Sequence, residues 1–101
     1  MSFCINFLGE ILMNLEEFKE SLARDGFEMR EAEMAPGIIN EEHSHPFDAR
    51  LYVLSGLLTV EYEGKTSTCG PGDTFSLSAN IPHTERVGEE GVTYLAGRRP
   101  A

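Results

Sequence analysis

The sequence predicts a single, mainly β domain, a sandwich or barrel of antiparallel strands, with one short helix near its start. A length of 101 residues is too small for two separate cores. From Phe27 onward, short apolar runs are separated by Gly and Pro about every eight to twelve residues, which is typical of short strands joined by turns. We therefore expect an N-terminal extension with a short helix over residues 1–26 and a β-barrel over residues 27–101.

The first twelve residues are mildly apolar and leave two interpretations open. They contain no cation, since Lys19 is the first Lys or Arg of the chain, and they lack the cleavage site of a secretory signal. Either the segment adds an edge strand or a dimer contact, or Met13 is the natural start of the protein.

A helix of about ten residues is predicted over residues 15–24. Asn14 stands at the N-cap position and Glu17 follows three residues later, which is a variant of the capping box. The apolar residues at helical spacing are Leu15, Phe18 and Leu22. We expect this face to pack against the rest of the domain.

The region after the helix contains three apolar runs with strand character, Ala49–Val60, Phe75–Leu77 and Val92–Leu95. Glu63, Gly64 and Lys65 lie between Tyr62 and Thr66 and predict a hairpin turn. Further glycines, among them Gly88 and Gly91, are expected to break the strands.

The charge balance excludes some partners. Eight Lys and Arg against 17 Asp and Glu give a net charge of −9, which disfavours nucleic acid and anionic membranes as partners. No apolar run approaches the roughly 18 residues that span a bilayer. Cys4 and Cys69 have no metal-site spacing; a disulfide between them is one interpretation, and two unpaired thiols in a cytoplasmic protein is the one we favour.

The three histidines of the chain predict a metal site. His43 and His45 are one residue apart, so on a strand their side chains leave the same face. His83 follows after a turn and a short strand, and antiparallel pairing can place it opposite the first two. Three imidazoles on one inward face bind a transition metal and leave coordination positions open.

These residues carry a resemblance to a known family. The segment Gly37-x5-His43-x-His45-x3-Ala49-x6-Gly56 resembles the first motif of the cupin superfamily. The second cupin motif is matched in part: the spacing of its first Gly and its His fits, whereas its Pro, second Gly and Asn are replaced. The residues concerned are Gly72, His83, Ser78, Asn80 and Val87. The resemblance implies an antiparallel double-stranded β-helix, or jelly-roll barrel, with His43, His45 and His83 as metal ligands.

The carboxylate ligand of the family does not carry over. Its position is Ala49 here, with Arg50 next to it. Asp48 is adjacent and is a candidate extra ligand if the turn at Pro46 re-aims its side chain. Arg50 either meets an anionic ligand or lies on a solvated or dimer-facing surface.

Glu85 is a candidate substitute for that carboxylate. Counting by twos from His83 places it on the inward face, where a carboxylate must be paired, bind a metal or be protonated. It would then be a catalytic base or an orienter of the bound molecule. The alternative is a residue at a strand end, paired with Arg86 or Arg98 at the rim.

Three functional interpretations follow. The first is a metal-binding cupin that acts on a small, oxygen-rich, anionic molecule, with Zn, Fe, Ni, Mn or Cu as the divalent cofactor. If it is an enzyme, the resemblance implies a metal-dependent dioxygenase, isomerase or lyase. The second is a non-catalytic module that binds a small ligand or a metal, and the third is a purely structural barrel. Because a small open barrel has edge strands to cover, we expect a homodimer.

Overall fold

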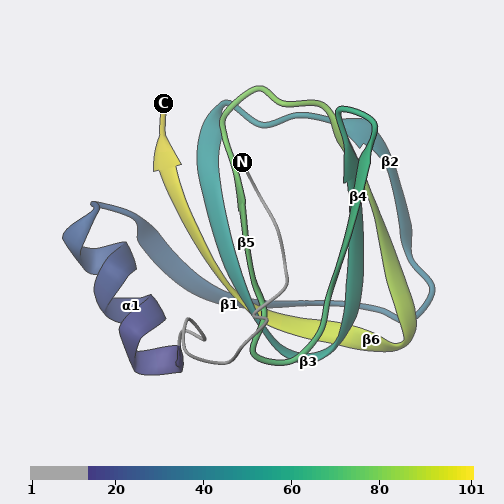
Figure 1. Cartoon of the computed structure of the whole chain (residues 1–101), viewed down its shortest axis with the longest axis horizontal. Helices are drawn as coiled ribbons and strands as arrows, with labels where there is room; N and C mark the ends of the chain where they lie inside the picture. The colour runs from purple at the N-terminus through teal and green to yellow at the C-terminus, as the bar shows by residue number, and fades with distance from the viewer. Residues whose placement is uncertain (1–13) are drawn as a thin grey trace.

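The computed structural model describes residues 14–101, which form one short helix and a six-stranded antiparallel sheet curled into a barrel (Figure 1). The elements are α1 Leu15–Arg24, β1 Glu28–Met34, β2 Ile39–His43, β3 Phe47–Tyr62, β4 Lys65–Cys69, β5 Thr74–Leu77 and β6 His83–Pro100. The all-β jelly-roll prediction is therefore confirmed. The expectations for the first twelve residues and for Met13 lie outside the described residues.

Helix α1 has the predicted bounds and the predicted cap. The Asn14 side chain accepts a hydrogen bond from the Glu17 backbone N–H at 2.8 Å, and the Glu17 carboxylate accepts one from the Asn14 N–H at 3.1 Å. Its apolar face packs on the outside of the sheet, to the left in Figure 1, where Phe18 and Leu22 contact Phe27 and Leu95. This small second core joins the helix to the barrel.

Two long strands, β3 and β6, form the frame of the barrel. They pair from Phe47–Pro100 at one end to Tyr62–His83 at the other, with irregularities near Gly56. Gly88 and Gly91 do not break β6, so that prediction is wrong. The strands bend instead, because Gly56 at φ +81° brings its α-carbon against the carbonyl of Gly91. The bend lets one pair of strands contribute to both halves of the barrel.

The sequence does not predict the polar strands β1 and β2, and it predicts β4 only as the second strand of a hairpin. β1, β2 and β4 carry mostly exposed residues and lack the apolar alternation that identifies a strand. They form because β6 and β3 offer hydrogen-bonding edges: β1 and β2 pair with β6, and β4 pairs with β3. The apolar runs that were predicted lie inside longer strands, β3, β5 and β6.

The hairpin between β3 and β4 is confirmed. Glu63 and Gly64 have φ of 49° and 75°, and Tyr62 pairs with Lys65 across them. Positive φ at both central residues matches a type I′ turn, whose twist suits two antiparallel strands.

The barrel interior has a filled part and an open part. The filled part holds the buried residues Val53, Leu58, Val60, Tyr62, Cys69, Phe75, Leu77, Val87 and Val92. Cys69 is fully buried and is not a free thiol, so the expectation of two unpaired thiols is wrong at this residue; Cys4 lies outside the described residues. The open part is a cavity of about 560 Å³.

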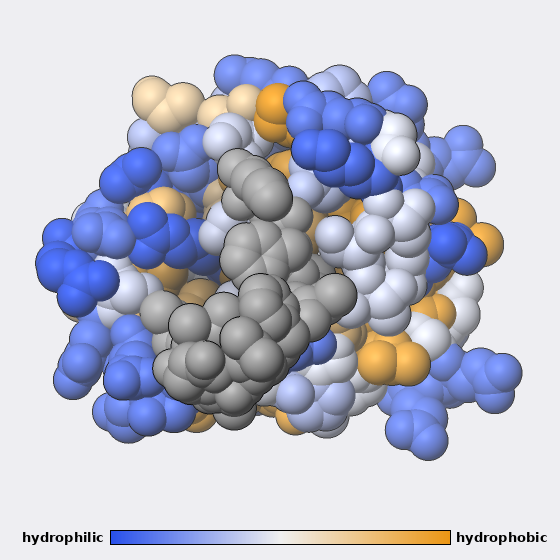
Figure 2. Space-filling model, viewed as in Figure 1, coloured by the Kyte–Doolittle hydropathy of each residue, from blue (hydrophilic) through white to orange (hydrophobic). Residues whose placement is uncertain are grey.

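The face of the molecule drawn in Figure 2 is largely polar where its residues are described. On the face shown in Figure 2, hydrophilic residues surround small hydrophobic areas. Within residues 14–101, no helix has the length and apolar character needed to cross a membrane.

Candidate metal centre

The three histidines come from two strands and one connection. His43 ends β2 and is the register partner of His83, the first residue of β6. His45 lies in the connection between β2 and β3, so the expectation that His43 and His45 share one strand is wrong. The connection is held instead by the Asn80 backbone N–H, which donates to the His45 carbonyl at 2.7 Å.

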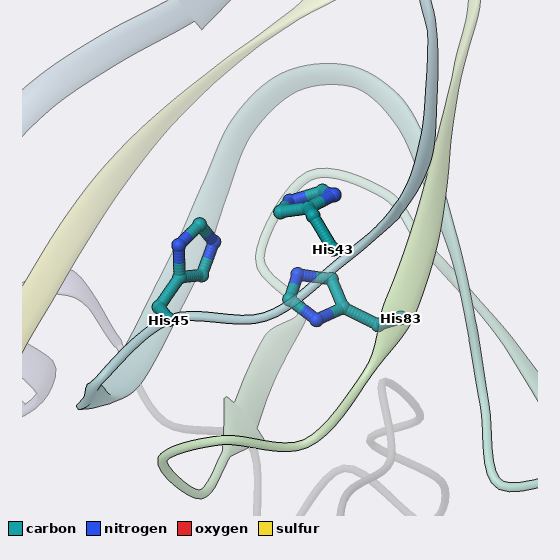
Figure 3. Close-up of side chains that lie close together, drawn as sticks. All are labelled: His43, His45 and His83. Atoms are coloured by element: carbon teal, nitrogen blue, oxygen red, sulfur yellow. The ribbon is translucent and has the colours of Figure 1, made fainter.

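The imidazole rings converge at the cavity (Figure 3). Ring centroids are 4.4 Å apart for His43 and His83, 4.9 Å for His43 and His45, and 5.2 Å for His45 and His83. One ring nitrogen from each residue lies within 4.8 Å of the others. Two nitrogens that each bind one ion at about 2.1 Å are at most about 4.2 Å apart, so a small inward movement of the rings lets all three hold one transition-metal ion.

Backbone carbonyls orient two of the rings. Nδ1 of His43 lies 2.7 Å from the Glu41 carbonyl, and Nδ1 of His83 lies 2.9 Å from the Ile81 carbonyl. A carbonyl only accepts, so in each neutral ring Nδ1–H is the donor and Nε2 keeps its lone pair. Metal-binding histidines are commonly oriented by such a hydrogen bond on the other nitrogen.

The surroundings of the third ring, that of His45, lower its pKa and so favour the neutral form. Burial is the main cause that lowers its pKa below the ordinary 6.5, followed by the neighbouring His43 and His83 rings. The Glu85 carboxylate acts in the opposite direction, and Arg98 adds a smaller lowering. The ring also stacks on Phe47, with centroids 4.8 Å apart and planes 12° from parallel. A neutral imidazole is the form that binds metal.

Glu85 faces the same cavity. Its two carboxylate oxygens lie 4.0 Å from Nε2 of His43 and 3.8 Å from Nε2 of His83, and the side chain is only 16% exposed. The Asn40 amide donates to one of these oxygens at 2.9 Å. The structure thus brings together Glu85 and two of the nitrogens that could hold a metal.

The structure does not bring Asp48 into this cluster. Its carboxylate accepts a hydrogen bond from the Ala79 backbone N–H at 2.9 Å and pairs with Arg99 at 3.0 Å. Ala49, the next residue, lines the cavity instead. Asp48 therefore fastens the start of β3 to the turn before β6 and to the end of β6.

These contacts predict a pH-dependent role for Asp48 in stability. The hydrogen bond from Ala79 and the bond from Arg99 lower the pKa of Asp48 below its ordinary 3.8. A lowered pKa contributes stability above that value, and the contribution is lost as pH falls through the folded-state pKa. We expect Asp48→Asn to be less stable than the wild type at pH 7 in urea unfolding, and the difference to shrink toward pH 3 and below. A difference of equal size at both pH values would contradict a contribution from the carboxylate charge.

Arg50 lines the cavity, but its guanidinium is engaged by residues that do not line it. It pairs with Asp25 at 2.8 Å, and its guanidinium lies 4.2 Å from the centre of the Phe27 ring. Arg99 lies over the same ring at 4.6 Å. These contacts belong to the junction between α1 and the sheet.

Sequence reasoning missed three residues that line the cavity with polar groups, Asn40, Tyr94 and Arg98. Asn40 positions Glu85, and burial raises the pKa of Tyr94, which keeps its hydroxyl protonated. The sequence predicted Arg98 only as a possible partner of Glu85 at the rim, not as a residue that lines the cavity. Strand alternation from Glu85 could not have found it, because β6 bends between them.

The donor set fits a divalent transition metal. The cluster offers three imidazole nitrogens, two of them oriented by backbone carbonyls, with a carboxylate beside them. Imidazole suits Zn, Fe, Ni and Cu, and the added carboxylate also suits Mn. Within residues 14–101 this is the one group of three or more such residues close enough to hold an ion.

Comparison with solved structures supports the fold. A structural-genomics protein of unknown function from Rhizobium leguminosarum bv. viciae is 28% identical, with a TM-score of 0.69 over 74% of this chain and 71% of that one. The DMSP lyase DddQ from Ruegeria pomeroyi is 24% identical, with a TM-score of 0.65 over 72% of this chain and 38% of the lyase. Bacillus subtilis oxalate decarboxylase, described with Mn(II) centres, is 26% identical, with a TM-score of 0.60 over 71% of this chain and 20% of that enzyme. The chain thus spans well under half the length of either enzyme.

Comparison at the level of sequence gives the family. No curated protein matches the chain. The family model described as "Cupin domain" matches residues 30–96, which is more than half of the chain and includes all three histidines and Glu85. Together with the barrel and the converging rings, this match shows that the chain belongs to the cupin family.

Proposed function

We propose that this cupin binds a divalent transition metal through His43, His45 and His83 and acts on a small, oxygen-rich, anionic molecule in the cavity. The observation that carries the proposal is the orientation of the rings, with backbone carbonyls on Nδ1 of His43 and His83 and the Nε2 atoms left to bind. When bound, such a metal supplies Lewis-acid stabilisation of a coordinated oxygen.

Glu85 is the residue we propose for proton transfer or for orienting the bound molecule. Its carboxylate is partly buried beside two of the rings, and Asn40 holds one of its oxygens. The second oxygen is therefore the one placed to accept a proton from a bound molecule. A base in this position contributes roughly 10²–10⁴-fold to a rate.

The relatives indicate the class of molecule but not its identity. One is named a DMSP lyase and another an oxalate decarboxylase, and both names describe small molecules that carry a carboxylate. The net charge of the three imidazoles, the metal and Glu85 is positive, which favours an anion. The reaction type we propose is one of those open to such sites: dioxygenation, isomerisation or elimination.

Metal analysis of natively purified protein tests the proposal. Elemental analysis is expected to find about one divalent transition-metal ion per chain, removable by a chelator and restorable by dialysis. Absence of stoichiometric metal after purification, together with failure to bind added Zn(II), Mn(II) or Co(II), would overturn it.

Glu85→Gln tests whether the carboxylate of Glu85 in particular, and not the negative charge of the protein as a whole, supports metal binding. The substitution removes one negative charge beside the rings, so metal affinity is expected to fall by about 10–100-fold while one ion per chain still binds at saturation. Competition with a chelator measures this affinity. Glu31→Gln is the control, since Glu31 is exposed on β1. Equal affinities in the two variants would contradict a place for Glu85 beside the metal.

A non-catalytic binding module is the second candidate. It is favoured by Ala49, which occupies the position where the resemblance implies a carboxylate ligand. Thermal-shift screening with small organic acids, followed by product analysis, distinguishes the two. Stabilisation by a ligand that the metal-loaded protein never converts supports the binding module.

We further propose a homodimer. Strand β1 pairs with β6 on one side and carries Met29, an exposed large hydrophobic residue that is 48% exposed. Such an edge favours pairing with a second chain. Light scattering on purified protein is expected to give about twice the chain mass of 11.2 kDa, and a mass equal to one chain would contradict the proposal.

A further inference from the structure

The cavity is lined by an arginine, Arg98, next to Ala49, the position where the cupin resemblance implies a carboxylate ligand. Arg98 on β6 is the register partner of Ala49 on β3, and both line the cavity with the three histidines. Residues directly opposite each other in an antiparallel pair project from the same face of the sheet. The guanidinium therefore replaces negative charge with positive charge in this part of the cavity.

Arg98 is available to a ligand. Four other arginines, Arg24, Arg50, Arg86 and Arg99, pair with carboxylates. Arg98 makes no ion pair within residues 14–101 and is exposed at the mouth of the cavity. Its guanidinium carbon lies over the Phe47 ring, 4.5 Å from the ring centre, and its register partner on β1 is Glu28. A cation–π contact positions a guanidinium without occupying its N–H donors.

Phe47 connects this cation to the metal centre. The same ring that Arg98 lies over stacks on His45 at 4.8 Å. The position of the guanidinium relative to the proposed ligand is thus set by one aromatic side chain. Glu85 lies beside the other two rings, those of His43 and His83. The positive Arg98 is therefore on the His45 side of the cluster, and the negative Glu85 is on the side of the other two rings.

From these contacts we infer that Arg98 determines specificity by binding the carboxylate of a small organic acid while a second oxygen group of the same molecule reaches the metal. The inference rests on the proposed function, because it takes the metal as the second point of attachment. A guanidinium presents paired N–H donors that match the two oxygens of a carboxylate. A cavity of about 560 Å³ admits a molecule of this class.

Binding of dicarboxylates to the cobalt-loaded full chain tests the inference. Malonate, succinate and glutarate are each compared by calorimetry with the half-amide, in which one carboxylate is replaced by a neutral group of similar size. The wild type is expected to bind at least one dicarboxylate more tightly than its half-amide, on the order of tenfold or more. Arg98→Gln and Arg98→Met are expected to bind that dicarboxylate and its half-amide with equal affinity.

Arg86→Gln is the matched control. Arg86 also lies on β6, but its charge is exposed and paired with Glu61, so its removal is expected to leave the preference intact. Cobalt content is measured in every variant, and one ion per chain shows that the site is preserved. The inference is overturned if both Arg98 variants keep the wild-type preference for the dicarboxylate over its half-amide. It is also overturned if the wild type shows no such preference for malonate, succinate or glutarate. Either result leaves the proposed metal function standing. Failure of the wild type to bind cobalt overturns both.

Discussion

Replacing His83 with alanine is expected to abolish stoichiometric metal binding. His83 is 4% exposed, and its Nδ1 is oriented by the Ile81 carbonyl. Removing one of three imidazole ligands leaves a site with two, so we expect affinity to fall by about a hundredfold or more. Metal present at about 100 times its dissociation constant stabilises a protein by about 2.7 kcal/mol, and this metal-dependent rise in melting temperature should disappear with the ligand.

Two further variants make the result interpretable. His45→Ala removes a ligand from the connection rather than from a strand, so its loss of metal does not depend on the packing of a buried strand residue. Asp48→Asn is the control: Asp48 is next to the site in sequence, but its carboxylate bonds to Ala79 and Arg99. Metal content and affinity should be unchanged in this variant. Wild-type affinity in both histidine variants would show that the three rings do not form the metal centre.

Gly56→Ala is expected to prevent cooperative folding. A Cβ on this residue would lie 1.8 Å from the Gly91 carbonyl oxygen and 2.9 Å from the α-carbon of Val92. These are backbone atoms of the paired strand, which cannot move aside without breaking the β3–β6 pairing. We expect a loss of more than about 4 kcal/mol in the free energy of unfolding, which is a large part of the stability of a domain of this size.

Gly37→Ala is the control that separates the clash of a new Cβ with the paired strand from the strain of placing alanine at a positive φ. Gly37 also has a positive φ, of +72°, but a Cβ there would meet nothing within 4 Å. The strain of placing alanine in this region is about 1–2 kcal/mol. In urea unfolding, Gly37→Ala should therefore show a modest decrease in the free energy of unfolding. Gly56→Ala should show no folded baseline even without urea. Similar losses in both variants would contradict the close approach of β3 and β6 as the cause.

The metal candidates were predictable from the sequence because their pattern is short and regular. His43 and His45 are separated by one residue, and His83 is the only other histidine of the chain. The predicted cause, alternation of His43 and His45 along one strand, is only part of the explanation. His45 lies outside β2, and its carbonyl accepts a hydrogen bond from the Asn80 backbone N–H. The spacing was informative even though the local structure differed from a plain strand.

The sequence by itself determined the features whose causes lie within a few residues. The cap of α1 needs only Asn14 and Glu17, and the hairpin at Glu63 and Gly64 needs only two residues with positive φ. The inward direction of Glu85 follows from its distance of two residues from His83. Local hydrogen bonds and strand alternation suffice for each of these, so they can be predicted without knowing the neighbours in space.

The tertiary structure alone decided which distant residues share the cavity. Strand β6 continues through Gly88 and Gly91 although its register with β3 shifts there, from Val92 opposite Gly56 to Val87 opposite Leu58. The polar strand β1 forms because β6 offers it an edge. The same pairing places Arg98 opposite Ala49. A register between two strands depends on the bend and the bulges of both, and no short stretch of sequence contains that information.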